Sequence, residues 1–122
     1  MRFKISIYGN DALWGSFTEE SFAALIAADA AFQRDLRESG ELISAEGMAD
    51  SGLVRVVRVR DGVRVVTMGP YLGGGEHLGS YFVVDCDSLE RALELAAGYP
   101  TAGGNGVEVW PLLEHSGTTL PD

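Results

Sequence analysis

The sequence has a single cysteine, Cys86, so no disulfide can form within one chain. Such cysteine usage is typical of a reducing compartment, and the apolar run "SYFVVDCD" around Cys86 indicates a buried strand residue. The sequence also has no apolar run long enough to cross a bilayer, and its first residues lack the apolar core and cleavage site of a secretory signal. We therefore predict a cytoplasmic protein with no membrane partner.

Positive charge is scarce. Nine lysines and arginines face eighteen acidic residues, for a net charge of -9. A negative field repels phosphate backbones, so we predict no nucleic-acid partner. With two histidines, one cysteine and no ligand spacing, no metal site is predicted. The glycine run Gly73–Gly75 lacks the G-x-G-x-x-G and P-loop patterns, so no cofactor is predicted either, and loop mobility explains it better than an anion-binding backbone nest.

The chain's 122 residues, 46% of them hydrophobic, are enough for one domain with its own core. Strand patterns alternate with helix patterns in the order β-α-β, hairpin, β-α-β. The first expected strand ends at Gly9, and the others cover about 41–48, 53–68 as a hairpin, 79–86 and 106–113. The expected helices cover 18–39 and 87–97. This order predicts an α+β fold with a ferredoxin-like antiparallel sheet and helices on one face, over residues 1–115, followed by a flexible tail at 116–122.

Local signals mark the ends of these elements. Thr18 is a predicted N-cap and Gly40 a predicted left-handed helix end. Asp61-Gly62 suits a type I′ hairpin turn. The spacing of Asp87 and Glu90 predicts a capping box for the second helix. The segment between the first strand and the first helix, which carries Trp14, reads as a polar loop.

Two expected apolar helix faces would cover one side of the sheet. The first consists of Phe22, Leu25, Ile26, Phe32 and Leu36, and the second of Leu89, Ala92, Leu93, Ala96 and Ala97. The other side of the sheet then has no cover. A second subunit is the simplest cover, so we predict a homodimer.

The chain resembles the YCII-related family, in particular its DGPF-type branch. The likeness is carried by Gly69-Pro70-Tyr71, Glu76, Leu78-Gly79, Tyr81-Phe82, "DSLERALELAAGYP" at 87–100 and "VEVWPLL" at 107–113, and it extends upstream through "IYGNDALW" and "LRESGELISAEGM". The resemblance implies a dimeric α+β barrel with paired pockets. It also implies that some relatives are lyases or dehalogenating isomerases acting on small lactone-type acids.

Three positions depart from the family pattern. Asp29 stands where YCII-type members have a histidine suspected of catalysis, Met68 stands where the DGPF aspartate would be, and Gly75 replaces a common lysine. These departures slightly favour a binding protein over an enzyme.

Asp29 is also singled out by spacing alone, because it lies within the apolar face of the first expected helix. A carboxyl among apolar neighbours is a candidate for proton transfer. The alternative is that Asp29 lies at the edge of that face or caps a nearby backbone group.

His77 can exchange a proton near neutral pH, and Glu76 could orient its ring. The alternative is a solvated histidine beside a glycine run. The remaining predicted ligand-binding residues are Trp14, Glu76, Tyr71 and Tyr81, although core or dimer packing explains such aromatic side chains equally well. Four arginines of the 53–68 hairpin could clamp a carboxylate or could protect an edge strand from aggregation.

Two functional hypotheses follow. One is a dimer that binds a small organic acid-type ligand without a cofactor. The other is a cofactor-free lyase or isomerase that uses Asp29 and His77 for proton transfer.

Overall fold

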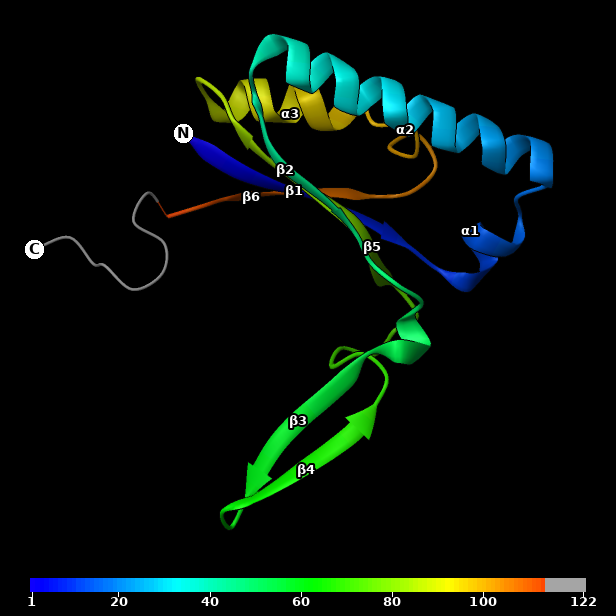
Figure 1. Cartoon of the computed structure of the whole chain (residues 1–122), viewed down its shortest axis with the longest axis vertical. Coiled ribbons are helices and arrows are strands. Elements are labelled where there is room, and N and C mark those ends of the chain that lie inside the picture. Colours follow the sequence, from blue (N-terminus) through cyan, green and yellow to red (C-terminus); the bar gives the residue numbers. More distant parts are fainter. Residues whose placement is uncertain (114–122) are drawn as a thin grey trace, which may run out of the picture.

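The computed structural model describes residues 1–113 (Figure 1). Its main sheet has the strand order β2-β5-β1-β6, with all neighbours antiparallel. The strands are β1 (Arg2–Gly9), β2 (Leu42–Gly47), β5 (His77–Asp85) and β6 (Val107–Pro111), and helices α2 (Glu19–Ser39) and α3 (Leu89–Ala97) lie on one face. The predicted ferredoxin-like α+β fold is confirmed. The predicted tail at 116–122 and His115 lie outside the described residues.

Four further elements complete the described part of the chain. Helix α1 (Asp11–Gly15) follows β1, and a 3-10 turn, η1 (Ser51–Leu53), follows β2. Strands β3 (Arg55–Arg60) and β4 (Val63–Met68) pair only with each other and extend away from the main sheet (Figure 1). Within residues 1–113, no helix combines the length and the apolar character needed to cross a membrane.

The core lies between the sheet and the two helices. Phe3 and Ile5 of β1 pair with Val84 and Phe82 of β5, and all four are buried. Because side chains alternate along a strand, the residues between them point to the opposite face. That second face carries Lys4, Ser6, Tyr8, Tyr81, Glu108 and Trp110, and neither α2 nor α3 covers it. We call it the open face.

The end signals of the first helix and of the hairpin were predicted correctly. The side chain of Thr18 accepts a hydrogen bond from Ser21 N–H, and Gly40 has a left-handed φ of 78°. Asp61 and Gly62 have φ values of 50° and 77°, as a type I′ turn requires. These features depend on a few adjacent residues, which explains why the sequence reveals them.

Two other local predictions were wrong. The segment around Trp14 is a helix rather than a loop, because the Asn10 side chain accepts a hydrogen bond from Leu13 N–H and caps it. The N-cap of α3 is Ser88, which accepts from Arg91 N–H, and not Asp87. At α3, a neighbouring residue of equal capping propensity occupies the position predicted for Asp87.

The predicted apolar faces were only partly right. In α2, Leu36 is buried, whereas Phe22 and Ile26 are about half exposed. In α3, Ala92 and Ala96 are buried, but Leu89 and Leu93 are exposed. Helical periodicity identifies one side of a helix but not how far the sheet extends beneath it, and the first turns of α2 lie beyond the packed core.

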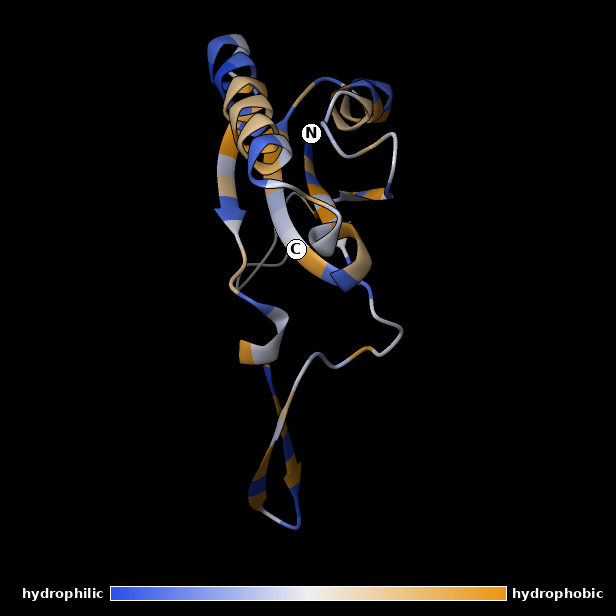
Figure 2. Ribbon diagram, turned by 90° about the vertical axis from the view of Figure 1, so that its right-hand side faces the viewer, coloured by the Kyte–Doolittle hydropathy of each residue, from blue (hydrophilic) through white to orange (hydrophobic). Residues whose placement is uncertain are grey.

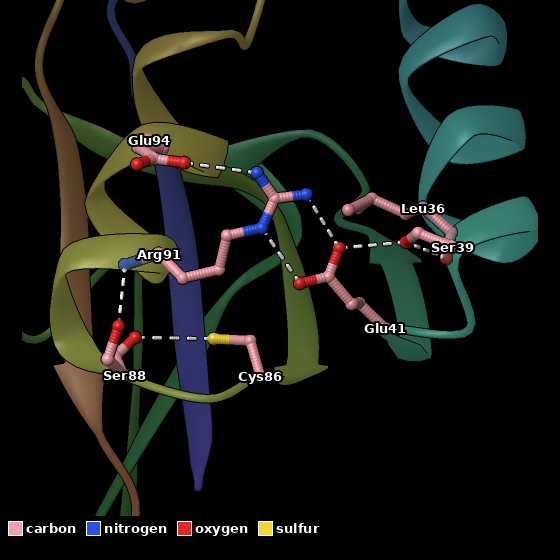
Figure 3. A network of polar contacts seen from close by, with 7 residues as sticks. All are labelled: Leu36, Ser39, Glu41, Cys86, Ser88, Arg91 and Glu94. Carbon is pink, nitrogen blue, oxygen red and sulfur yellow. Dashed lines mark hydrogen bonds and ion pairs between the residues drawn. The ribbon is translucent and has the colours of Figure 1, made fainter.

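One ion-pair network joins the ends of the two helices (Figure 3). Arg91 of α3 donates to both carboxylate oxygens of Glu41, at 3.0 and 2.9 Å, and to Glu94 at 3.1 Å. Ser39, the last residue of α2, also donates to Glu41 at 2.8 Å. The hydrogen bond from Arg91 is the main cause that lowers the pKa of Glu41.

We expect Glu41→Gln to reduce stability at pH 7 but not in acid. A carboxyl whose pKa is lower in the folded state stabilises the fold above its unfolded pKa, and this stabilisation is lost as the pH falls through the folded value. The urea midpoints of wild type and Glu41→Gln should therefore differ at pH 7 and converge as the pH falls below the folded pKa of Glu41. Glu38→Gln, which alters an exposed residue with no ion pair among residues 1–113, is the control. Parallel pH curves for wild type and Glu41→Gln would contradict the prediction.

Candidate functional site

A pocket of about 410 Å³ lies between α1, α2, the start of β5 and the segment 48–51. Its apolar lining comes mainly from Ile7, Trp14, Phe22, Leu25, Ile26, Met48 and Leu78. Its polar lining comes from Asp11, Asp29, Asp50, Ser51, His77, Ser80, Tyr99 and Thr101. The half-exposed side chains of Phe22 and Ile26 thus form a wall of this pocket rather than part of the core. An apolar hollow with a few polar groups is the usual form of a small-molecule site.

Trp14 lies against the sheet because two glycines leave room for its ring. A Cβ atom on Gly9 would overlap the Trp14 indole, and one on Gly79 would come within 3.3 Å of it. Trp14 also stacks on Phe17, with ring centroids 6.2 Å apart. Strands β1 and β5 therefore hold the indole at the pocket wall, which agrees with the predicted ligand-binding position of Trp14 without testing that role.

Asp29 lies in the pocket lining, and both of its carboxylate oxygens accept hydrogen bonds. Tyr99 donates its hydroxyl proton to Oδ1 at 2.7 Å, and Gln33 donates an amide N–H to Oδ2 at 2.7 Å. Gln33 lies one turn further along α2, whereas Tyr99 follows α3. Asp29 thus connects α2 to the segment that follows α3.

Tyr99 keeps its proton in this arrangement. Burial is the largest cause that raises the pKa of the Tyr99 hydroxyl, and the hydrogen bond to negatively charged Asp29 adds to it. A tyrosinate beside a carboxylate would be repelled and poorly solvated. Tyr99 therefore acts as a hydrogen-bond donor to Asp29 at physiological pH.

His77 is the first residue of β5, so this strand begins two residues before its expected start at about 79. Its Nδ1 atom is buried and has no hydrogen-bond partner among residues 1–113, and the same holds for Oγ1 of Thr101. Glu76 does not orient the ring as predicted, because its carboxylate accepts from Asn10 at 3.0 Å. Two buried polar atoms without partners in one lining are unusual, because buried polar groups in folded proteins are nearly always hydrogen-bonded.

A second, half-open groove of about 460 Å³ adjoins this pocket. It is lined by Tyr8, Met48, Ala49, Asp50, Ser51, Leu53, Val54, Pro70, Tyr71, Leu72, Glu76, His77 and Leu78. We call it the hairpin-base groove, because its lining flanks β3 and β4 in the sequence. His77 and the segment 48–51 line both the groove and the pocket. The predicted positions Tyr71 and Glu76 thus lie in the groove, whereas Asp29 and Trp14 lie in the pocket.

Tyr81 lies on the open face of the sheet, away from both hollows. It pairs with Ser6, and the Lys4 ammonium lies 4.9 Å from its ring centroid. Its neighbour Phe82 points into the core instead. A role for Tyr81 in ligand binding would therefore require a site on that face.

The hairpin arginines do not converge into a clamp. By the strand register, Arg55 and Arg64 lie on one face of the hairpin, and Arg58 and Arg60 lie on the other. Arg55 donates to the carbonyls of Gly52 and Val54, and Arg58 lies 5.4 Å from the Tyr71 ring centroid. The four cations are thus spread over both faces.

Cys86 is buried, and its thiol donates to the Ser88 carbonyl at 3.5 Å. Burial raises the pKa of this thiol, which keeps it protonated and unreactive. Within residues 1–113, no three histidine, cysteine, aspartate or glutamate side chains come together in a way that could hold a metal ion.

Comparison with known proteins places this geometry in a family. The model of the YCII-related domain matches residues 1–116. The chain belongs to the YCII-related family. It is also similar to an uncharacterized protein of Rhizobium meliloti (strain 1021), with 24% identity over 123 residues covering 99% of each chain. The assignment to the DGPF-type branch stays a prediction.

Sequence reasoning missed Tyr99, Ser80 and Thr101 as lining residues of this YCII-related protein. Tyr99 and Thr101 follow the last helix, about 70 residues after Asp29, and no local pattern connects them. The only available signal was "GYP" at 98–100, which reads as a helix end. The contact between Asp29 and Tyr99 exists only because α2 and α3 pack side by side on the sheet.

We expect Tyr99→Phe to lower the free energy of unfolding by about 1–2 kcal/mol, because Asp29 loses a hydrogen bond in a half-buried site. Urea unfolding measures this difference. Tyr71→Phe, which removes the hydroxyl of an exposed tyrosine, is the control. Equal stabilities of the two variants would contradict the assigned role of the hydroxyl.

Proposed function

We propose that this YCII-related protein is a homodimer that binds a small organic acid-type ligand, without a cofactor, in the pocket between α1 and α2. The observation that carries the proposal is the pair of buried atoms without partners, His77 Nδ1 and Thr101 Oγ1, in one pocket lining. A ligand oxygen could accept hydrogen bonds from both. A buried polar group without a hydrogen bond costs free energy, so a ligand that pairs with both atoms gains affinity.

The remaining lining suits the apolar part of such a ligand. Trp14, Phe22 and Ile26 offer aromatic and aliphatic surface that is already partly exposed to solvent. The lining includes three aspartates and no lysine or arginine, so His77 is the one lining side chain that can become a cation. An organic acid would therefore bind through His77, with its apolar part directed toward the aromatic wall.

Proton transfer by Asp29 and His77 is the second candidate. In its favour, both residues line the same pocket. Against it, both oxygens of Asp29 already accept hydrogen bonds from groups of the protein. A general base needs an oxygen lone pair within hydrogen-bond reach of the substrate's proton, and these two bonds use half of the accepting sites of the carboxylate. This arrangement favours binding over catalysis.

The homodimer is supported by the open face of the sheet. Trp110 is 56% exposed there and pairs with Lys4, whose ammonium lies 4.9 Å from the Tyr81 ring centroid. Glu108 accepts hydrogen bonds from Tyr8 and Trp110. Aromatic side chains of this kind are enriched at protein interfaces, and an identical face can cover them around a two-fold axis.

A screen of small carboxylic acids and their primary amides tests the ligand proposal. At pH 6, at least one acid should raise the melting temperature of the wild type by about 2 °C or more. His77→Gln should lose the response to that acid, because glutamine cannot carry positive charge. Asp35→Asn, on α2 outside this pocket, should respond like the wild type.

Two results would count against the ligand proposal. The first is a wild type that responds to none of the acids, and the second is an equal response of wild type and His77→Gln. Turnover of a bound acid that is abolished by Asp29→Asn, with binding retained, would instead favour the enzyme hypothesis.

The dimer has a separate test. We expect Trp110→Ser to weaken self-association by about tenfold or more, because aromatic residues at the centre of an interface contribute most of its affinity. Sedimentation equilibrium measures the effect. Trp14→Ser, which alters a pocket residue, is the control and should leave self-association unchanged. A wild type that stays monomeric at high concentration would refute the dimer.

A further inference from the structure

The β3–β4 hairpin has little support from its own chain. Its strands form a separate two-stranded sheet that extends away from the body (Figures 1 and 2). A hydrogen bond from Gly69 N–H to the Val54 carbonyl, at 2.8 Å, closes its base. An isolated two-stranded hairpin is only marginally stable in water. The hairpin would therefore gain stability from packing against another surface.

One side of the hairpin combines exposed apolar side chains with two arginines. The register places Val57, Val59, Val66 and Met68 on the same side as Arg55 and Arg64, and the four apolar side chains are between 47% and 76% exposed. We call this side the valine face. The opposite side also has two arginines, Arg58 and Arg60, but only one of its three valines, Val63, is exposed. Alternating hydrophobic and hydrophilic residues are visible along both strands in Figure 2. A face with several exposed apolar side chains marks an interaction surface or an aggregation risk.

The hairpin-base groove has the matching character. Leu53, Tyr71 and Leu72 line it and are 66–74% exposed, so its apolar lining is as uncovered as the valine face. Asp50 and Glu76 are also in the lining, which has no lysine or arginine. The groove therefore suits an apolar segment that carries positive charge.

Charge complementarity points to a second copy as that partner. Residues 55–68 carry four arginines and one aspartate, for a net charge of +3. The rest of the chain carries five basic and seventeen acidic residues, for a net charge of -12. Arg60 and Arg64 make no ion pair among residues 1–113. An acidic body and a basic arm attract each other in two copies of the same chain.

We propose that each hairpin of the homodimer packs its valine face into the hairpin-base groove of the second copy. A two-fold axis makes the exchange reciprocal, since each copy offers both an arm and a groove. Because the groove and the ligand pocket share His77 and the segment 48–51, the arm of one subunit would border the ligand pocket of the other. This inference rests on the proposed homodimer, and it adds the arm exchange to it.

Hydrogen–deuterium exchange at several protein concentrations tests directly whether each hairpin packs into the groove of the second copy. As dimer forms, backbone amides in residues 55–68 should become protected, and those in 48–54 and 70–78 should become protected together with them. Protection of the hairpin without the groove would mean that hairpins pair with each other, which would overturn the proposal.

The valine face has a matched pair of variants. The double variant Val57→Thr, Val66→Thr keeps β-branched side chains, and thus strand propensity, but places hydroxyls on the valine face. It should weaken dimerisation by about tenfold or more, whereas Val63→Thr on the opposite side should have little effect. Dimerisation should also weaken as salt is added, because the paired charges are screened.

The outcomes separate this inference from the proposed function. The arm exchange would be overturned, and the open-face dimer left intact, by two results together. The dimer would be weakened by Trp110→Ser but not by the double variant, and the hairpin amides would exchange hydrogen for deuterium equally fast in monomer and dimer. A protein that stays monomeric at every concentration would overturn both. Ligand binding by the pocket is measured independently of either result.

Discussion

The packing of α2 on the sheet depends on the side chain of Tyr99. Its ring contacts Phe32 of α2 and Phe82 of β5, with centroid distances of 5.1 and 5.6 Å, and its hydroxyl donates to Asp29. One residue thus joins the long helix, the central strand and the end of α3 through apolar and polar contacts. Because Asp29 lies one turn before Phe32, this contact also sets where the core ends and the pocket begins.

The pocket exists because α2 is longer than the surface it covers. Its last turns pack on the sheet through Leu36, whereas its first turns, with Phe22 and Ile26, extend past the buried core. Trp14 fills part of the space because Gly9 and Gly79 leave room for its ring. The apolar side chains of these first turns therefore form the wall of a hollow instead of part of the core.

Much of the fold could be predicted because it depends on local chemistry. Alternation marked β1, Thr18 and Gly40 marked the ends of α2, and Asp61-Gly62 marked the hairpin turn. The pattern also placed Asp29 among apolar neighbours, and the structure places it in the pocket lining. Prediction failed where adjacent residues compete for one role, as at Ser88, and where a short helix depends on a single cap, as at Asn10.

The sequence by itself determined the order of the strands and of the two longer helices, the ferredoxin-like sheet and the family, because periodicity, caps and turns act over a few residues. Only the tertiary structure decided which groups meet. It brought Tyr99 to Asp29 across 70 positions, tied Glu76 to Asn10 rather than to His77, and left His77 Nδ1 buried without a partner among residues 1–113. Such contacts follow from how helices pack on a sheet, and side-chain packing between distant segments leaves no periodic signal in the chain.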